Sequence, residues 1–89
     1  MNKIRFSSHA LKRMQERNVS RYIVISSLNN PDIIEISNHA PNRFLAKKRY
    51  FNQYFSKEHL LIIVFEINKN IIEIITIIDT SKINKYLNL

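Results

Sequence analysis

The chain has 89 residues, of which 45% are hydrophobic, so its length fits a single domain over residues 1–89 with one modest core. Lysine and arginine outnumber aspartate and glutamate by 14 to 7, and a sequence pI near 10.0 favours an anionic partner, most often a nucleic acid. Cysteine is absent, which excludes disulfides and thiolate metal sites. An acidic protein or a membrane surface would also suit this charge.

No segment has the length of a membrane span. The longest apolar stretch, residues 60–65 continuing to residue 67, is far shorter than the roughly 20 residues that cross a bilayer. The first six residues carry charge but are not followed by the apolar region of a secretory signal. We therefore expect a soluble, cytoplasmic protein without a membrane partner.

Glycine is absent as well, so positions that need a positive φ angle are expected to fall to asparagine, the next most tolerant residue. Several asparagines lie between apolar runs, where the chain has to reverse. The turns expected on this basis are at Asn18, Asn29, Asn30, Asn38, Asn42, Asn68 and Asn70.

Helical spacing dominates the first third of the chain. After a short opening strand at residues 4–6, Ser7 or Ser8 can cap a helix over about residues 9–17, which ends at Asn18. Ser20 can cap a second helix over residues 21–28. Proline at position 31 stops this helix by the residue before it.

From residue 32 onward, short runs rich in isoleucine and aromatic residues alternate with polar turns, which is typical of strands. The predicted strands are residues 33–37, 43 to about 54, 60–67 and 71–78, followed by a short basic tail at residues 83–87. The last two strands are apolar at nearly every position, which predicts burial on both faces, and residues 68–70 join them as a tight hairpin. The fold class is therefore α+β: two N-terminal helices packed on one face of a four-stranded, mainly antiparallel sheet, with the opening strand as an addition.

The first helix carries one cationic arc. His9, Arg13 and Arg17 are spaced four residues apart, so their side chains are neighbours on a helix surface. An imidazole that exchanges protons near neutral pH, aligned with two guanidiniums, suits phosphate binding or phosphoryl transfer. The plain structural alternative is that Glu16 pairs with Arg13 or Lys12, and that His9 merely lies near the helix start.

The long strand contains a second basic cluster, Lys47, Lys48 and Arg49, followed by Tyr50. Cations interleaved with aromatic rings suit single-stranded nucleic acid, because bases stack on the rings while phosphates meet the cations. Equally, lysines protect an edge strand against aggregation while the aromatic rings form core.

The tail places Lys82, Lys85 and Tyr86 directly after the last strand, where a hydroxyl flanked by lysines can serve as an acid, a base or a phosphate ligand. A terminal segment that packs one ring is the alternative. His9, His39 and His59 are scattered without metal-ligand spacing, so neither a metal site nor another cofactor is predicted.

Together these segments resemble a small bacterial and archaeal family, filed as a domain of unknown function, within the RelE/ParE-like toxin superfamily. The resemblance covers essentially the whole chain. The segments that carry it are Ser8-His9-Ala10, Arg13-Met14, Glu16 to Ser20, Asn29 with Pro31-Asp32, Thr76, Thr80-Ser81-Lys82 and Lys85-Tyr86.

The resemblance implies the fold of type II toxins, which a cognate antitoxin protein commonly neutralises and many of which cut mRNA, often on the ribosome. Residues that match are His9, Arg13 and Arg17 on the helix, the basic strand from Lys47 to Arg49, and Tyr86, which falls where RelE-type nucleases often have a late tyrosine.

The resulting hypothesis is an endoribonuclease that cuts mRNA without a metal ion, by attack of the ribose 2′-OH on the adjacent phosphate. It assigns catalytic roles to His9 as base or acid, to Arg13, Arg17 and Arg49 as phosphate ligands, and to Tyr86 as a supporting proton donor. Long-range attraction of RNA is assigned to Lys47, Lys48, Lys82 and Lys85.

This hypothesis requires the helix cations and the basic strand to converge on one phosphate-sized cleft. Two other functions fit the same sequence. One is a ParE-like toxin that poisons gyrase by contact and needs no acid or base. The other is a non-catalytic module that binds nucleic acid.

Overall fold

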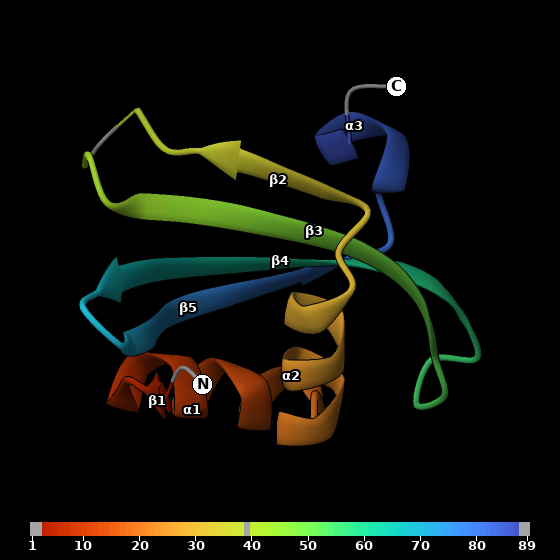
Figure 1. The fold of residues 1–89 in the computed structure, drawn as a ribbon. Coiled ribbons are helices and arrows are strands. Elements are labelled where there is room, and N and C mark those ends of the chain that lie inside the picture. Colours follow the sequence, from red (N-terminus) through yellow and green to blue (C-terminus); the bar gives the residue numbers. More distant parts are fainter. Residues whose placement is uncertain (1–2, 39, 88–89) are drawn as a thin grey trace.

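A five-stranded mixed sheet forms the centre of the molecule, with helices on both of its faces (Figure 1). The computed structural model describes residues 3–38 and 40–87. Its elements in chain order are β1 (Lys3–Phe6), α1 (Ser8–Arg17), α2 (Arg21–Asn29), β2 (Ile33–Ile36), β3 (Arg43–Asn52), β4 (Lys57–Asn68), β5 (Ile71–Thr80) and α3 (Ile83–Leu87). The strand order is β1-β5-β4-β3-β2, in which β1 runs parallel to β5 and the other neighbours are antiparallel.

The α+β class and the two N-terminal helices on one sheet face are confirmed. The opening segment pairs with β5 as a fifth strand, which makes the predicted antiparallel sheet a mixed one. Residues 83–87, predicted only as a short basic tail, form the helix α3, whose Leu87 packs against Leu60 and Ile62. Among the described residues, no helix is both long and apolar enough to cross a membrane.

Within the described ranges, positive φ angles occur at Asn18, Ser56 and Lys69. Asn18 ends α1 in the left-handed conformation, as predicted. The predicted tight hairpin at residues 68–70 is confirmed, but Lys69 has the positive φ angle in place of Asn68 or Asn70. Asn68 is instead paired with Ile71 in the β4–β5 ladder, which leaves the turn position to Lys69.

Ser7 joins β1 to α1 and ties both to β5. Its hydroxyl oxygen accepts a hydrogen bond from the Ala10 N–H at 3.0 Å, as a helix N-cap, and donates to the Ile75 carbonyl at 2.7 Å. The β4–β5 register shifts at Val64/Phe65, which leaves Ile75 as the extra residue of a β-bulge. The bulge therefore anchors the start of α1 beside β5.

Alternate residues of β4 serve two separate cores, as expected for a strand buried on both faces. Leu61 and Ile63 face α1 and α2 and pack with Val24. Leu60 and Ile62 face the other way, toward α3. Figure 1 shows α1 and α2 together on one side of the sheet and α3 on the other.

Lys47 is a buried cation on the α3 face, with 5% of its surface exposed. Its ammonium donates to the Tyr86 carbonyl at 2.7 Å and pairs with Glu35 Oε1 at 3.0 Å. The last carbonyls of a helix lack partners within the helix. The Lys47 side chain therefore joins β2, β3 and α3.

Replacing Lys47 by methionine tests this connection. Lys47→Met keeps most of the aliphatic stem but leaves the Tyr86 carbonyl without this donor and Glu35 without its cation. We expect the free energy of unfolding, measured by urea denaturation, to fall by about 1–3 kcal/mol. Lys12→Met, at an exposed position of α1, is the matched control. Equal stability of the two variants would contradict the structural role of Lys47.

Candidate active site

A cleft of about 490 Å³ lies where β4 begins and β5 ends. Because β1 pairs with residues 71–74 of β5, the second half of β5 is a sheet edge in the described part of the chain. The end of α1, the β3–β4 turn with the start of β4, and the end of β5 with the segment that follows it all contribute residues to this cleft. The lining residues of this β4–β5 cleft are Arg17, Phe55, Lys57, His59, Ile78, Asp79, Thr80, Ser81, Lys82 and Tyr86.

A buried polar network lies under the cleft and centres on the Asp79 carboxylate. One carboxylate oxygen accepts from the Tyr50 hydroxyl at 2.6 Å, and the other lies 2.9 Å from His59 Nδ1. The Asn52 amide donates to the Tyr50 oxygen at 2.9 Å and to Asp79 Oδ2 at 3.4 Å. His59, Asp79 and Asn52 are exposed by only 5%, 7% and 3%, so this network is shielded from water.

One ring nitrogen of His59, Nε2, takes no part in this network. A carboxylate can only accept hydrogen bonds, so the proton in the contact with Asp79 is on His59 Nδ1. In the neutral ring, Nε2 is then an acceptor. This atom is buried, and among the described residues it has no hydrogen-bond partner. An imidazole oriented by a carboxylate, with its second nitrogen unused, is the arrangement of a general base.

Tyr50 supports Asp79 as a permanent donor. Burial raises the pKa of the Tyr50 phenol well above its usual value, and the hydrogen bond to the Asp79 carboxylate raises it further. The phenol therefore keeps its proton through the neutral and mildly alkaline range. Asp79 is thus held from two sides, by Tyr50 and by His59.

Cations surround the cleft without neutralising partners. Arg17 at the end of α1, Lys57 at the start of β4 and Lys82 after β5 are all exposed. Within residues 3–38 and 40–87, none of the three forms an ion pair. The cleft is therefore positively charged and suits an anion such as a phosphate group.

Phe55 forms one wall of the cleft. Its ring stacks on the His59 imidazole, with centroids 5.3 Å apart and planes at 19°, and half of its surface remains exposed. The backbone N–H of Phe55 donates to the Asn52 side-chain oxygen at 3.1 Å. The β3–β4 turn is thereby attached to the polar network that it covers.

The described residues around this network do not form a cluster of metal ligands. Among the described residues, no three histidine, aspartate or glutamate side chains gather as metal ligands. His59 and Asp79 instead bond to one another.

Of the three residues predicted on α1, Arg17 lines the cleft, whereas His9 and Arg13 do not. His9 is exposed in the first turn, eight residues before Arg17, which places it roughly 12 Å away along the helix axis. Arg13 is half-buried, and its Nε lacks a hydrogen-bond partner among the described residues.

The basic strand does not reach the β4–β5 cleft either. Lys47 is engaged with Glu35 and α3, Lys48 pairs with Asp32 at 3.4 Å, and Arg49 pairs with Glu58 at 3.1 Å. The Arg49 backbone N–H also donates to the Asp32 carboxylate, which holds the pKa of Asp32 below its usual value, with Lys48 as a further cause. The expected convergence of helix and strand cations on one cleft was therefore wrong.

Two residues of the predicted tail do line the cleft, Lys82 and Tyr86. Lys85 instead lies over the Tyr86 ring, with its ammonium 5.4 Å from the ring centroid. The tail and Arg17 of the first helix thus line the same cleft, although they are far apart in the sequence.

Sequence reasoning missed His59, Asp79 and Lys57. A polar residue at the border of an apolar strand is a weak signal, and both His59 and Asp79 occupy such positions. Their contact depends on how β4 and β5 are aligned, and the bulge at Ile75 shifts that alignment. Spacing along the chain could not reveal it.

The fold and the cleft define a small α+β domain with a cationic cleft above a buried histidine and aspartate pair. The chain belongs to the family described as a domain of unknown function (DUF4258), whose model matches residues 6–79. The matched segment includes Arg17, His59 and Asp79 but ends before Lys82 and Tyr86. No curated protein and no solved structure matches the chain significantly.

The raised pKa of Tyr50 predicts how stability depends on alkaline pH. Above the usual tyrosine value of 10.0, the unfolded chain loses the phenol proton while the folded one keeps it, so stability falls as pH rises. Tyr50→Phe should remove this part of the loss, by about 1 kcal/mol or less near pH 11 because the phenol is only partly buried. Urea denaturation across alkaline pH measures the effect.

Tyr54→Phe, at an exposed ring of the β3–β4 turn, is the matched control and should follow the wild-type profile. A Tyr50→Phe profile parallel to that of the wild type would contradict the proposed coupling of Tyr50 to Asp79.

Proposed function

We propose that the protein is a metal-independent endoribonuclease of the RelE toxin type, which cuts mRNA in the β4–β5 cleft. In this proposal His59 replaces His9 as the base. Arg17 keeps its role, and Lys57 and Lys82 replace the other helix and strand cations that were expected to converge. One observation carries this proposal: Asp79 orients the imidazole of His59, whose buried Nε2 has no hydrogen-bond partner among the described residues. His59 lines a cleft with three cations that form no ion pair in the same part of the chain. A base and phosphate-binding cations are the groups that cleavage of RNA by its own 2′-OH requires.

His59 Nε2 takes the proton of the ribose 2′-OH. The 2′-oxygen then forms a bond to phosphorus, and the bond from phosphorus to the 5′-oxygen breaks. The Tyr86 hydroxyl gives its proton to the departing 5′-oxygen. The products are a 2′,3′-cyclic phosphate and a 5′-hydroxyl end, after which His59 returns its proton to solvent and Tyr86 regains one.

Arg17 and Lys82 stabilise the negative charge that grows on the phosphoryl oxygens, because a guanidinium can contact two such oxygens at once. Lys57 adds to the attraction of the RNA strand. Asp79 and Tyr50 act on the imidazole through hydrogen bonds and are positioning residues. Because His59 Nε2 is buried, the turn that carries Phe55 has to move aside when the substrate enters.

The resemblance to RelE-type toxins adds partners to the proposal. The proposed partners are mRNA on the ribosome and a cognate antitoxin protein. The proposed location is the cytoplasm. The formal net charge of +7 is consistent with binding to RNA.

Cleavage of RNA in the presence of EDTA, with and without ribosomes, tests the activity. We expect His59→Gln to lower the cleavage rate by about 10²- to 10⁴-fold, as for loss of a general base. Arg17→Gln, at an exposed position that leaves the fold intact, should also lower it. His9→Gln is the matched control, because His9 is exposed near the far end of α1, and it should cut RNA at the wild-type rate.

Several results would overturn the proposal. RNA that stays intact both with and without ribosomes would remove the activity. Growth inhibition that persists undiminished in His59→Gln would favour a toxin that acts on gyrase by contact. Binding of RNA without cleavage or growth inhibition would favour a non-catalytic module.

A further inference from the structure

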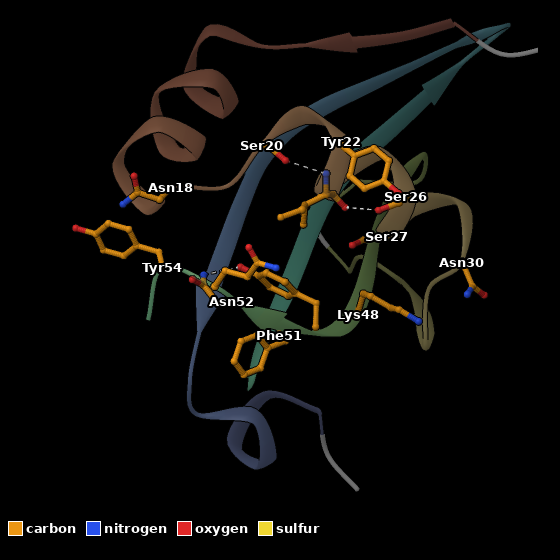
Figure 2. Close-up of a pocket in the computed structure, with 13 residues that line it drawn as sticks. Asn18, Ser20, Tyr22, Ser26, Ser27, Asn30, Lys48, Phe51, Asn52 and Tyr54 are labelled. Atoms are coloured by element: carbon orange, nitrogen blue, oxygen red, sulfur yellow. Dashed lines mark hydrogen bonds between the residues drawn. The ribbon is translucent and has the colours of Figure 1, made fainter. Parts of the chain in front are cut away.

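A second hollow, of about 650 Å³, lies between α2 and β3. We call it the α2–β3 hollow. Figure 2 shows Tyr22 and three serines on the α2 side, with Phe51, Asn52 and Lys48 of β3 across from them. Its volume is in the range of sites that bind small molecules or single residues of a polymer, roughly 300–1,000 Å³.

Large aromatic rings stand exposed around this hollow. Tyr22, Phe51 and Tyr54 have 79%, 61% and 68% of their surface exposed. Three such rings around one depression form an apolar surface that a folded chain does not need for its own core. Flat rings of this kind are suited to stacking with another planar group.

Hydrogen-bonding groups lie among the rings, while the lining holds a single charged side chain. Asn18 and Gln53 bring amides, whereas the amide of Asn52 is already engaged in the polar network. Ser27 is 4% exposed and lines the hollow. Lys48 is the one charged lining residue within that part of the chain. A ligand with a planar ring and polar edges fits this set better than a bare anion does.

The α2–β3 hollow is adjacent to the β4–β5 cleft. Asn18 of the hollow directly follows Arg17 of the cleft, and Tyr54 directly precedes Phe55. Asn52 lines the hollow and donates to Asp79, which lines the cleft. The two depressions therefore lie on either side of the β3–β4 turn and share the polar network between them.

We propose that the α2–β3 hollow binds an unpaired nucleobase of the RNA whose backbone lies in the β4–β5 cleft. The base stacks on the exposed rings, chiefly Tyr22 and Tyr54, and its polar edge meets the amides and Ser27. For its ligand this inference rests on the proposed function. It adds that the substrate is single-stranded at the cut, because a paired base could not leave its duplex to enter the hollow at low cost.

Binding can be measured apart from cleavage with a fluorescent single-stranded RNA that carries 2′-O-methyl groups at every position, since these block the 2′-OH attack. We expect Tyr22→Ala to weaken binding by about 5- to 150-fold, the loss of one base-stacking contact. Tyr22→Phe should bind like the wild type because it keeps the ring. Ile36→Ala, at an exposed apolar residue of β2 outside the hollow, is the matched control and should also bind normally.

An abasic scan of the same RNA separates stacking from general attraction. Removing one base should weaken binding to the wild-type protein but not to Tyr22→Ala, because the variant has already lost that contact. If Tyr22→Ala and Tyr54→Ala bind like the wild type and no single base matters, the nucleobase site is overturned, whatever the cleavage assay gives.

The two proposals fail in distinguishable ways. Base-dependent binding without cleavage of unmodified RNA would overturn the nuclease and retain the nucleobase site. Cleavage that is unaffected by Tyr22→Ala, together with base-independent binding, would retain the nuclease and overturn the nucleobase site. Absence of any RNA binding would overturn the nucleobase site, and intact RNA in the EDTA assay would then overturn the nuclease as well.

Discussion

The Asp79 carboxylate is the group on which the candidate site depends. It lies at the end of β5, is almost fully buried, and accepts hydrogen bonds from Tyr50 and Asn52 of β3 while contacting His59 of β4. A buried carboxylate without such donors would be strongly destabilising. Satisfying it brings three strands into one fixed arrangement and orients the imidazole that faces the cleft.

The β5 strand has different neighbours along its length, and this asymmetry creates room for a site. Its first half pairs with β1. At the bulge, the Ile75 carbonyl accepts a hydrogen bond from Ser7, which precedes α1. Its second half remains an edge. There Arg17, at the far end of α1, meets the segment that follows β5. Cations that are far apart in sequence thereby surround the His59–Asp79 pair.

Two kinds of buried polar group serve the two faces of the sheet. On the α3 face, Lys47 has a structural role, because its ammonium contacts Glu35 and the Tyr86 carbonyl. On the face covered by α1 and α2, one ring nitrogen of His59 has no hydrogen-bond partner in the described part of the chain. A buried acceptor left unsatisfied costs stability, and groups of this kind are common where a protein acts on a substrate. Cationic residues of β3 thus support the fold, while the candidate chemistry belongs to residues that border the apolar strands.

Local patterns in the sequence were enough to predict both N-terminal helices, Asn18 as the end of the first, the later strands and their burial on two faces, because capping, helical spacing and apolar alternation act over a few residues. They also singled out Arg17, Lys82 and Tyr86 as charged or polar residues near the ends of elements. Tertiary structure alone decided that these three share a cleft with His59 and Asp79, and that His9 and the basic strand do not. The reason is that strand register, the Ile75 bulge and the return of α3 across the sheet are contacts between distant residues, which no local spacing encodes.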